Sequence, residues 1–102
     1  MRPKNFEWDP EKSRKNFEKH GIDFVAAQAL WNRPVLQKPT KPGSDDERYA
    51  VFGIIGGIHW TAIVSYRKQH VRIISVRRSR KKEVEAYDRF KRWQEKDNRR
   101  RV

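Results

Sequence analysis

The sequence contains no cysteine. A disulfide framework, a thiolate metal site and a thiol nucleophile are therefore all excluded. The same absence fits a reducing compartment, because disulfide-stapled domains belong to oxidising ones. We accordingly expect a cytoplasmic protein.

Long apolar runs are also missing. The longest nearly apolar stretch, residues 50–58, has nine residues, and three of them are glycine. About 20 apolar residues are needed to cross a bilayer. The first residues are polar and charged and lack the apolar segment of a signal peptide. We therefore expect neither a membrane partner nor secretion.

Acidic residues are few, with 13 Asp and Glu against 25 Lys and Arg and a formal net charge of +12. Residues 1–66 hold 10 basic and 8 acidic groups, whereas residues 67–102 hold 15 and 5, a net charge of +10. Positive charge concentrated in this way favours a polyanionic partner, and nucleic acid first.

Large aromatic side chains compensate for an apolar content of only 35%. Four Trp, three Tyr and five Phe supply surface that can be buried. A chain of 102 residues can build one core but not two. We expect a single domain over residues 1–102, with residues 98–102 as a frayed basic tail.

Local patterns predict the first elements. An alternating strand at residues 6–8 is followed by a helix that begins after the cap Asp9 and ends at Gly21. Asp23 then caps a second helix over residues 24–31.

The middle of the chain has strand character, and the end is helical. A Pro-rich loop covers residues 38–46, and Ser79 caps a final helix over residues 80–98. The order predicts an α+β fold with two N-terminal helices, an antiparallel meander of about four strands plus the short N-terminal strand, and a C-terminal helix. All helices are expected on one face of the sheet. The meander strands are predicted at residues 35–37, 48–55, 59–67 and 70–77.

The last predicted strand leads into consecutive arginines. Strict alternation places neighbouring side chains on opposite faces of a strand, so Arg77 and Arg78 are predicted to face opposite sides. One face would carry Val71, Ile73, Ser75 and Arg77, and the other Arg72, Ile74, Val76 and Arg78.

Three groups of motifs lie in order along the chain. The first is FEWDPEK at residues 6–12, with Asn16 and KHGIDF at residues 19–24. The second is DERY at residues 46–49, followed by Phe52, Gly53 and Gly57. The third is YR at residues 66–67 and VRIISVRRS at residues 71–79, with Glu83 and Tyr87 beyond. In order and spacing these motifs resemble the BrnT toxin family over nearly the whole chain.

The resemblance implies a RelE-like fold and a metal-independent endoribonuclease that cleaves RNA, needs no cofactor and inhibits translation. It also implies a bacterial toxin that is neutralised by a BrnA-type antitoxin, whose ribbon-helix-helix part binds operator DNA. The toxin would then reach DNA only through its antitoxin. By the same analogy we expect a 2:2 toxin–antitoxin heterotetramer.

RNA cleavage without a metal needs a base for the 2′-hydroxyl, cations for the phosphorane charge and an acid for the leaving oxygen. Arginine suits the cationic task, because its planar guanidinium binds two phosphate oxygens and stays charged. By the resemblance, the catalytic positions are Lys19, Arg67, Arg77 and Arg78. His20 is added on chemical grounds, since imidazole exchanges protons near neutral pH.

Other residues are candidates for RNA binding or for secondary roles. Each secondary candidate has a structural alternative, because Glu47 could form an ion pair and Tyr66 and Tyr87 could belong to the core. His20 could likewise cap the helix end before Gly21. No metal is expected, since the three histidines lie on separate elements without paired ligand spacing. The RNA-binding candidates are Arg48, Arg72, Arg80, Lys81 and Lys82.

Two other functions compete with the ribonuclease. A non-catalytic basic module would bind RNA or DNA, and loss of a cation would only weaken binding and flatten its salt dependence. An interaction protein with an acidic partner would show no nuclease activity at all.

Overall fold

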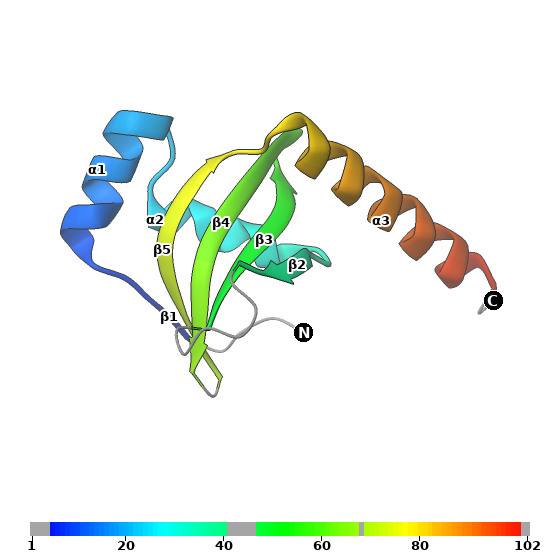
Figure 1. The fold of residues 1–102 in the computed structure, drawn as a ribbon, viewed down its shortest axis with the longest axis horizontal. Coiled ribbons are helices and arrows are strands. Elements are labelled where there is room, and N and C mark those ends of the chain that lie inside the picture. The colour runs from blue at the N-terminus through cyan, green and yellow to red at the C-terminus, as the bar shows by residue number, and fades with distance from the viewer. Residues whose placement is uncertain (1–4, 41–46, 68, 101–102) are drawn as a thin grey trace.

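The computed structural model of the chain describes residues 5–40, 47–67 and 69–100. It contains one five-stranded sheet, helical segments between its first and second strands in the chain, and a long C-terminal helix (Figure 1). The elements are β1 (Asn5–Glu7), α1 (Pro10–His20), α2 (Phe24–Ala27), the 3-10 helix η1 (Gln28–Asn32), β2 (Leu36–Pro39), β3 (Arg48–Ile55), β4 (Ile58–Arg67), β5 (His70–Arg78) and α3 (Lys81–Arg100).

The sheet has the strand order β1-β5-β4-β3-β2. Strands β2 to β5 form the predicted antiparallel meander. The short N-terminal strand pairs with β5 in the parallel direction, with Phe6 opposite Val71, so the sheet is mixed. The sequence predicts the strand but not its partner, because a three-residue strand carries no pairing signal of its own.

The predicted caps of the first two helices, Asp9, Gly21 and Asp23, are confirmed. Asp9 accepts a hydrogen bond from the Glu11 amide at 2.9 Å. Gly21 adopts φ +80°, a left-handed conformation that glycine enters without a Cβ penalty, and its amide donates to the Phe17 carbonyl. Asp23 likewise accepts from the Ala26 amide at 2.8 Å.

The second helix is not one α-helix over residues 24–31. It changes into η1 after Ala27, because Leu30 must lie directly against the sheet at Gly53. A Cβ on Gly53 would come within 2.8 Å of Leu30 Cδ2. The tighter 3-10 turn lets Leu30 and Trp31 both enter the core.

Different helices cover the two faces of the sheet. Thr61 and Ala62 are consecutive in β4, so their side chains point to opposite faces. Ala62 lies in the main core with Phe24 of α2, whereas Thr61 donates to Glu83 of α3 at 3.1 Å. We call the Ala62 side the core face and the Thr61 side the open face.

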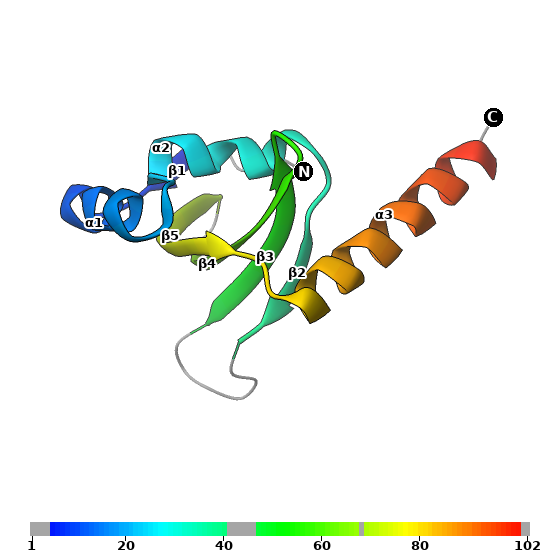
Figure 2. The ribbon, with the colours of Figure 1, turned by 90° about the horizontal axis from the view of Figure 1, so that it is seen from above.

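The expectation that all helices share one face is therefore wrong. Only two residues separate β5 from α3, and polar contacts at the open face fix the start of α3 there. Figure 2 shows α1, α2 and η1 together on one side, with α3 projecting away from the sheet. Phe52 of β3 and Tyr87 of α3 are buried outside the main core cluster, in the region where α3 packs against β3.

The strict alternation predicted for β5 is also wrong. Val71, Ile73 and Val76 are all buried, although Val76 has the opposite parity. The register shifts from Val64 opposite Ile73 to Ile63 opposite Ser75, so Ile74 is an extra residue. A bulge of this kind inserts one residue and resets the faces. Arg77 and Arg78 still follow one another within β5 and still face opposite sides.

The final helix begins at Lys81, one residue later than predicted. The Glu83 carboxylate accepts from the Arg80 amide at 2.7 Å and caps this end. The Ser79 hydroxyl, predicted as the cap, instead lies 2.8 Å from Thr61 Oγ1. The helix continues to Arg100, beyond its predicted end at residue 98.

Two expectations fall partly outside the described residues. The first two residues of the predicted loop over residues 38–46 belong to β2, and residues 41–46 are not described. Of the predicted tail, residues 98–100 are helical, and 101–102 are not described. No helix in the described part of the chain has the length and apolar character that crossing a membrane requires.

Candidate active site

An ion pair with Glu83 of α3 holds Arg77 at the end of β5. Its Nη1 donates to Glu83 Oε1 at 2.7 Å and its Nη2 to Oε2 at 2.9 Å. The two side chains are only 25% and 16% exposed. This bond raises the pKa of Arg77 above its usual value. Two parallel hydrogen bonds fix the plane of the guanidinium, so Arg77 is oriented before any substrate arrives.

Glu83 is the centre of a wider polar network. Besides Arg77, the Thr61 hydroxyl and the Arg80 amide donate to Oε1. The hydrogen bonds from Arg77 lower the pKa of Glu83 to about 2, with help from these other donors. A carboxyl with so low a pKa is a poor proton acceptor near neutral pH. Glu83 therefore positions Arg77 and the start of α3 rather than moving a proton.

Arg78 faces the core side, opposite to Arg77. Its Cζ lies 5.7 Å from the centroid of the Trp60 ring, and Trp60 is only 7% exposed. Arg78 itself is exposed. A cation over an indole face is held in place while its N–H groups remain accessible. Arg78 is thus an oriented cation whose N–H groups can still bind a phosphate.

Lys19 and His20 occupy the last turn of α1, and Asn16 ties that helix to β5. Asn16 Nδ2 donates to the Val76 carbonyl at 2.9 Å, and its Oδ1 accepts from the Val76 amide at 3.1 Å. Figure 1 shows α1 and β5 running in the same direction toward this end of the sheet. His20 lies four residues, about 6 Å along the helix axis, beyond Asn16. The structure therefore brings Lys19 and His20 to the end of the sheet that carries Arg78.

A histidine–carboxylate pair lies on the open face at the same end. His59 Nε2 is 2.8 Å from Asp88 Oδ1, and the His59 carbonyl accepts from the Ser79 amide. His59 and Thr61 are two residues apart and so share a face. Sequence reasoning assigns His59 no role, because Asp88 lies 29 residues away. Its alternation with Thr61 is the one signal that could have found it.

Arg67 is separated from the other four predicted catalytic residues. It pairs with His70 at the β4–β5 turn, whereas Arg77 pairs with Thr61. Six strand residues, about 20 Å, separate Arg67 from Thr61. One phosphate cannot span that distance, so Arg67 does not share a phosphate with Arg77 or Arg78.

The predicted RNA-binding residues fall into two groups. Arg48 and Arg72 both pair with Ser65, so together with Arg67 they form an exposed row across the open face. We call Arg48, Arg67 and Arg72 the basic strip. Glu47 is exposed beside the strip, just before β3. The second group occupies the exposed start of α3 and comprises Arg80, Lys81 and Lys82.

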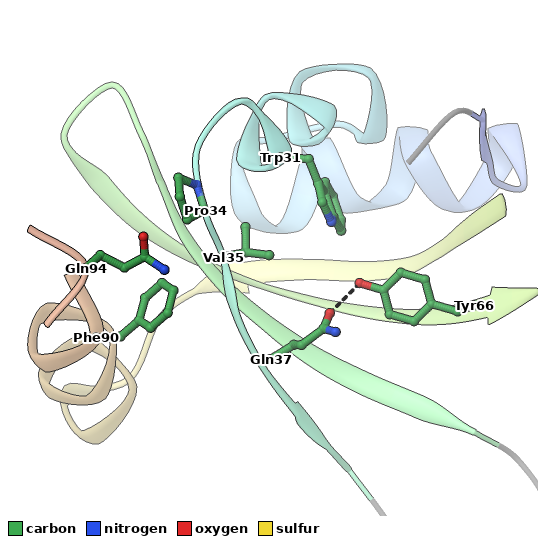
Figure 3. A pocket seen from close by; sticks show the side chains of 7 residues that line it. All are labelled: Trp31, Pro34, Val35, Gln37, Tyr66, Phe90 and Gln94. Atoms are coloured by element: carbon green, nitrogen blue, oxygen red, sulfur yellow. Dashed lines mark hydrogen bonds between the residues drawn. The ribbon is translucent and has the colours of Figure 1, made fainter. Parts of the chain in front are cut away.

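The two candidate tyrosines make structural contacts. Tyr66 donates its hydroxyl to Gln37 Oε1 at 2.6 Å, as Figure 3 shows. Tyr87 is 4% exposed and donates to the Pro34 carbonyl at 3.2 Å. Burial raises the pKa of both phenols. The Tyr66 hydroxyl holds β2, and the Tyr87 hydroxyl holds the segment just before β2. These contacts support structural rather than catalytic roles for both tyrosines.

Arg77, Arg78 and His59 thus lie at one end of the sheet, and the last turn of α1, which carries Lys19 and His20, lies beside that end on the core side. Such groups can neutralise a phosphate and transfer protons. Across residues 5–40, 47–67 and 69–100, no three His, Cys, Asp or Glu side chains come together in a way that could hold a metal ion. We call the end that carries Arg77, Arg78, Lys19, His20 and His59 the β5–α3 end.

Comparison with known proteins gives a family. Residues 8–83 match the family described as "Ribonuclease toxin, BrnT, of type II toxin-antitoxin system". The match begins just before α1 and ends at Glu83, in the first turn of α3. No match was found among curated proteins. Since more than half of the chain is covered, this protein belongs to the BrnT family, the ribonuclease toxins of type II toxin–antitoxin systems.

Proposed function

We propose that this chain is a metal-independent endoribonuclease toxin that cleaves RNA at the β5–α3 end. The observation that carries the proposal is the arrangement of Arg77 and Arg78, which are consecutive, oriented by different partners and placed on opposite sides of a strand end. A phosphodiester at that end meets a fixed cation from each side.

In this proposal the arginines stabilise the phosphorane charge. Arg78 binds the phosphate directly, since its guanidinium is exposed beside Trp60. Arg77 remains paired with the ionised Glu83, so it contributes N–H donors at a fixed position rather than a net positive charge. Preorganised groups of this kind contribute more than mobile ones, because no reorganisation is needed during the reaction. Lys19, exposed in the last turn of α1, adds a further cation.

Two imidazoles supply the proton transfers. His20 acts as the base that removes the 2′-hydroxyl proton, and His59 acts as the acid that protonates the 5′-oxygen. In-line attack places the nucleophile and the leaving group on opposite sides of the phosphorus. His20 comes from the core-face helix and His59 from the open face, so they approach the strand end from opposite sides. Asp88 lies 2.8 Å from His59 Nε2 and orients the ring.

The basic strip binds the rest of the RNA. Arg48, Arg67 and Arg72 lie on the open face, the same face as Arg77. Their distance from the β5–α3 end suits phosphates of neighbouring nucleotides rather than the one that is cleaved. Arg80, Lys81 and Lys82 attract the strand near the start of α3. Glu47, Tyr66 and Tyr87 have structural roles in this account.

At the level of the cell, we propose a bacterial cytoplasmic toxin of RelE-like fold that stops translation by cutting RNA. Family membership supports a protein antitoxin, and the antitoxin is proposed to be of the BrnA type with a ribbon-helix-helix DNA-binding part. The assembly is proposed to be a 2:2 heterotetramer that contacts operator DNA through the antitoxin alone.

Cleavage of a defined single-stranded RNA by the purified chain in excess EDTA tests this function. We expect chelator-resistant cutting that leaves 2′,3′-cyclic phosphate ends, and no cutting when every 2′-hydroxyl is methylated. Arg78→Ala, purified identically, controls for contaminating nuclease, and Lys12→Ala removes an exposed cation on α1 as a matched charge control. Cutting that EDTA abolishes, or equal cutting by Arg78→Ala, would contradict the proposal.

A non-catalytic RNA- or DNA-binding module is the second candidate. The exposed basic strip favours it, because Arg48, Arg67 and Arg72 can hold a backbone without any chemistry. Under that alternative, Arg78→Ala would weaken binding and lower the salt dependence, and the wild-type chain would release no cyclic phosphate under any condition.

A further inference from the structure

A groove at the β2 edge of the sheet, between η1 and α3, is lined by aromatic rings and side-chain amides together. It has a volume of about 460 Å³, within the range of small-molecule sites. Its rings are Trp31, Tyr66 and Phe90, and its amides are Gln37 and Gln94. Figure 3 shows Phe90 and Gln94 of α3 on one side of the start of β2, with Trp31, Gln37 and Tyr66 on the other.

A second hollow continues this groove and brings charge to it. It shares Phe90 and Gln94 with the groove, has a volume of about 180 Å³ and is also lined by Arg33, Lys91 and Glu95. The site therefore offers stacking surfaces, amide donors and acceptors, and two cations side by side. These are the three kinds of contact that proteins use to bind one unpaired nucleotide, through its base, its base edge and its phosphate.

We propose that this groove binds an unpaired adenine nucleotide of the RNA substrate. The base stacks against Phe90 and the neighbouring rings, the amides of Gln37 and Gln94 read its edge, and Arg33 and Lys91 hold its phosphate. A glutamine amide presents a donor and an acceptor in the spacing of the adenine N6 and N7 atoms, which is why adenine is preferred. Glu95 is a hydrogen-bond acceptor for a ribose hydroxyl and makes no phosphate contact.

Tyr66 already engages one of the two amides and thereby orients it. Its hydroxyl donates to Gln37 Oε1, which leaves the Gln37 Nε2 group facing the base as a donor. Phe90 is likewise held in place, since its ring lies 5.9 Å from Tyr87 and is stacked 6.5 Å from Trp93. Fixed rings lose little conformational freedom when a base stacks on them.

The groove is placed to select where the RNA is cut. Phe90 follows Glu83 by two turns of α3, about 10 Å along the helix axis. A nucleotide in the groove would therefore be close in the strand to a phosphate at the β5–α3 end. The matched family region ends at Glu83, so the α3 side of the groove, Phe90 and Gln94, lies outside that region, whereas Trp31, Gln37 and Tyr66 lie inside it. The inference rests on the proposed ribonuclease function, which makes RNA the ligand.

Binding of strands that cannot be cleaved tests the inference separately from catalysis. Fluorescein-labelled ten-nucleotide strands of 2′-fluoro adenosine and 2′-fluoro uridine lack the attacking hydroxyl, and anisotropy reports their affinity. The wild-type chain is expected to bind the adenosine strand roughly tenfold more tightly than the uridine strand. Gln94→Ala and Phe90→Leu should remove most of this preference and leave uridine binding within about twofold. Lys12→Gln, a surface charge on α1, should change neither value beyond a general salt effect.

Three outcomes would overturn the inference. The first is an adenosine preference that survives in both Gln94→Ala and Phe90→Leu, with folding confirmed by urea unfolding. The second is competition by AMP at concentrations as low as the strand itself, which would assign the groove to a free nucleotide instead of RNA. The third is unchanged RNA binding in both variants together with loss of neutralisation by the antitoxin, which would make the groove a protein-docking site.

Cleavage assays then separate this inference from the proposed function. If natural RNA is cut, Gln94→Ala should lower the share of cuts near adenines, whereas Lys12→Gln should leave that share unchanged. If no RNA is cut under any condition, the proposed function fails while the binding result still decides the groove.

Discussion

Both ends of the β4–β5 pair carry arginine side chains, which are held by neighbouring groups at one end and exposed to solvent at the other. At the β5–α3 end, Glu83 and Trp60 hold Arg77 and Arg78 in fixed positions. At the turn end, Arg67 and Arg72 project from exposed strand positions. Net charge alone does not distinguish these ends. The fold distinguishes them, because among the residues that the structure describes only the β5–α3 end has a helix start, a partly buried carboxylate and an indole ring to orient its cations.

This difference separates two tasks. A fixed guanidinium stabilises charge that appears only in the transition state. A solvated guanidinium attracts phosphates from a distance and loses much of its effect at high salt. We therefore expect mutations at the β5–α3 end to change the rate of cleavage and mutations in the basic strip to change affinity.

Large effects on the cleavage rate, comparable to that of losing Arg78, are expected from the two histidines. His20→Gln and His59→Gln should each lower the single-turnover cleavage rate by about a hundredfold, the lower range for general acid or base catalysis. A His20→Gln variant that cleaves at the wild-type rate across the pH range would remove His20 from the mechanism.

Asn16→Ala is expected to have the largest effect on stability. It leaves the carbonyls of Val76 and Ile22 and the amide of Val76 without their partner in a buried place. The free energy of unfolding should fall by about 3 kcal/mol. Urea unfolding measures this loss, with Lys12→Ala as a control expected to lie within about 0.5 kcal/mol of wild type. If Asn16→Ala lowers the free energy of unfolding by no more than Lys12→Ala does, the packing of α1 against β5 does not depend on this contact.

Glu83→Gln should destabilise the fold by roughly 1–3 kcal/mol near pH 7. The folded-state pKa of Glu83 is lowered to about 2, so its contribution is present above the ordinary carboxyl pKa. That contribution is lost as the pH falls from about 4.5 toward 2. The difference in stability between wild type and Glu83→Gln should therefore shrink over this range. Urea unfolding at pH 7, 5, 3.5 and 2.5 measures it, and a pH-independent difference would refute the ionic origin.

The smallest effects are expected in the basic strip. Arg67→Ala and Arg72→Ala should each reduce affinity for uncleavable RNA a few-fold at moderate salt. Each should also reduce the slope of log affinity against log salt by about 0.7, the value for one single-strand phosphate contact. Anisotropy titrations from 50 to 300 mM salt give this slope. Unchanged slopes in both variants would mean that RNA does not lie along the open face.

Local chemistry made much of the fold predictable from the sequence. Asp9, Gly21 and Asp23 form hydrogen bonds with residues only a few positions away in the chain, so their positions predict the helix ends. Strand alternation likewise located β3, β4 and β5 to within a residue. The bulge at Ile74 was not predictable, because it depends on which residue of β4 lies opposite.

The candidate site was only partly predictable for the same reason. Arg77, Arg78, Lys19 and His20 are recognised by residue type and by resemblance. The His59–Asp88 pair and the contact of Thr61 with Glu83 join residues 29 and 22 positions apart. Such contacts exist only because α3 begins on the open face, which contradicts the expectation that all helices share one side. The separation of Arg67 from the other cations also became visible only from the strand register.

The measurement that tests the central claim most directly compares Arg78→Ala with Arg67→Ala. Both variants lose one arginine from the same strand pair, and single-turnover cleavage of one defined RNA in EDTA, at saturating protein, removes differences in affinity. The account predicts a rate loss of about a hundredfold or more for Arg78→Ala, as for loss of one transition-state contact, and less than about fivefold for Arg67→Ala. Equal losses, or a larger loss for Arg67→Ala, would contradict the placement of the active site at the β5–α3 end.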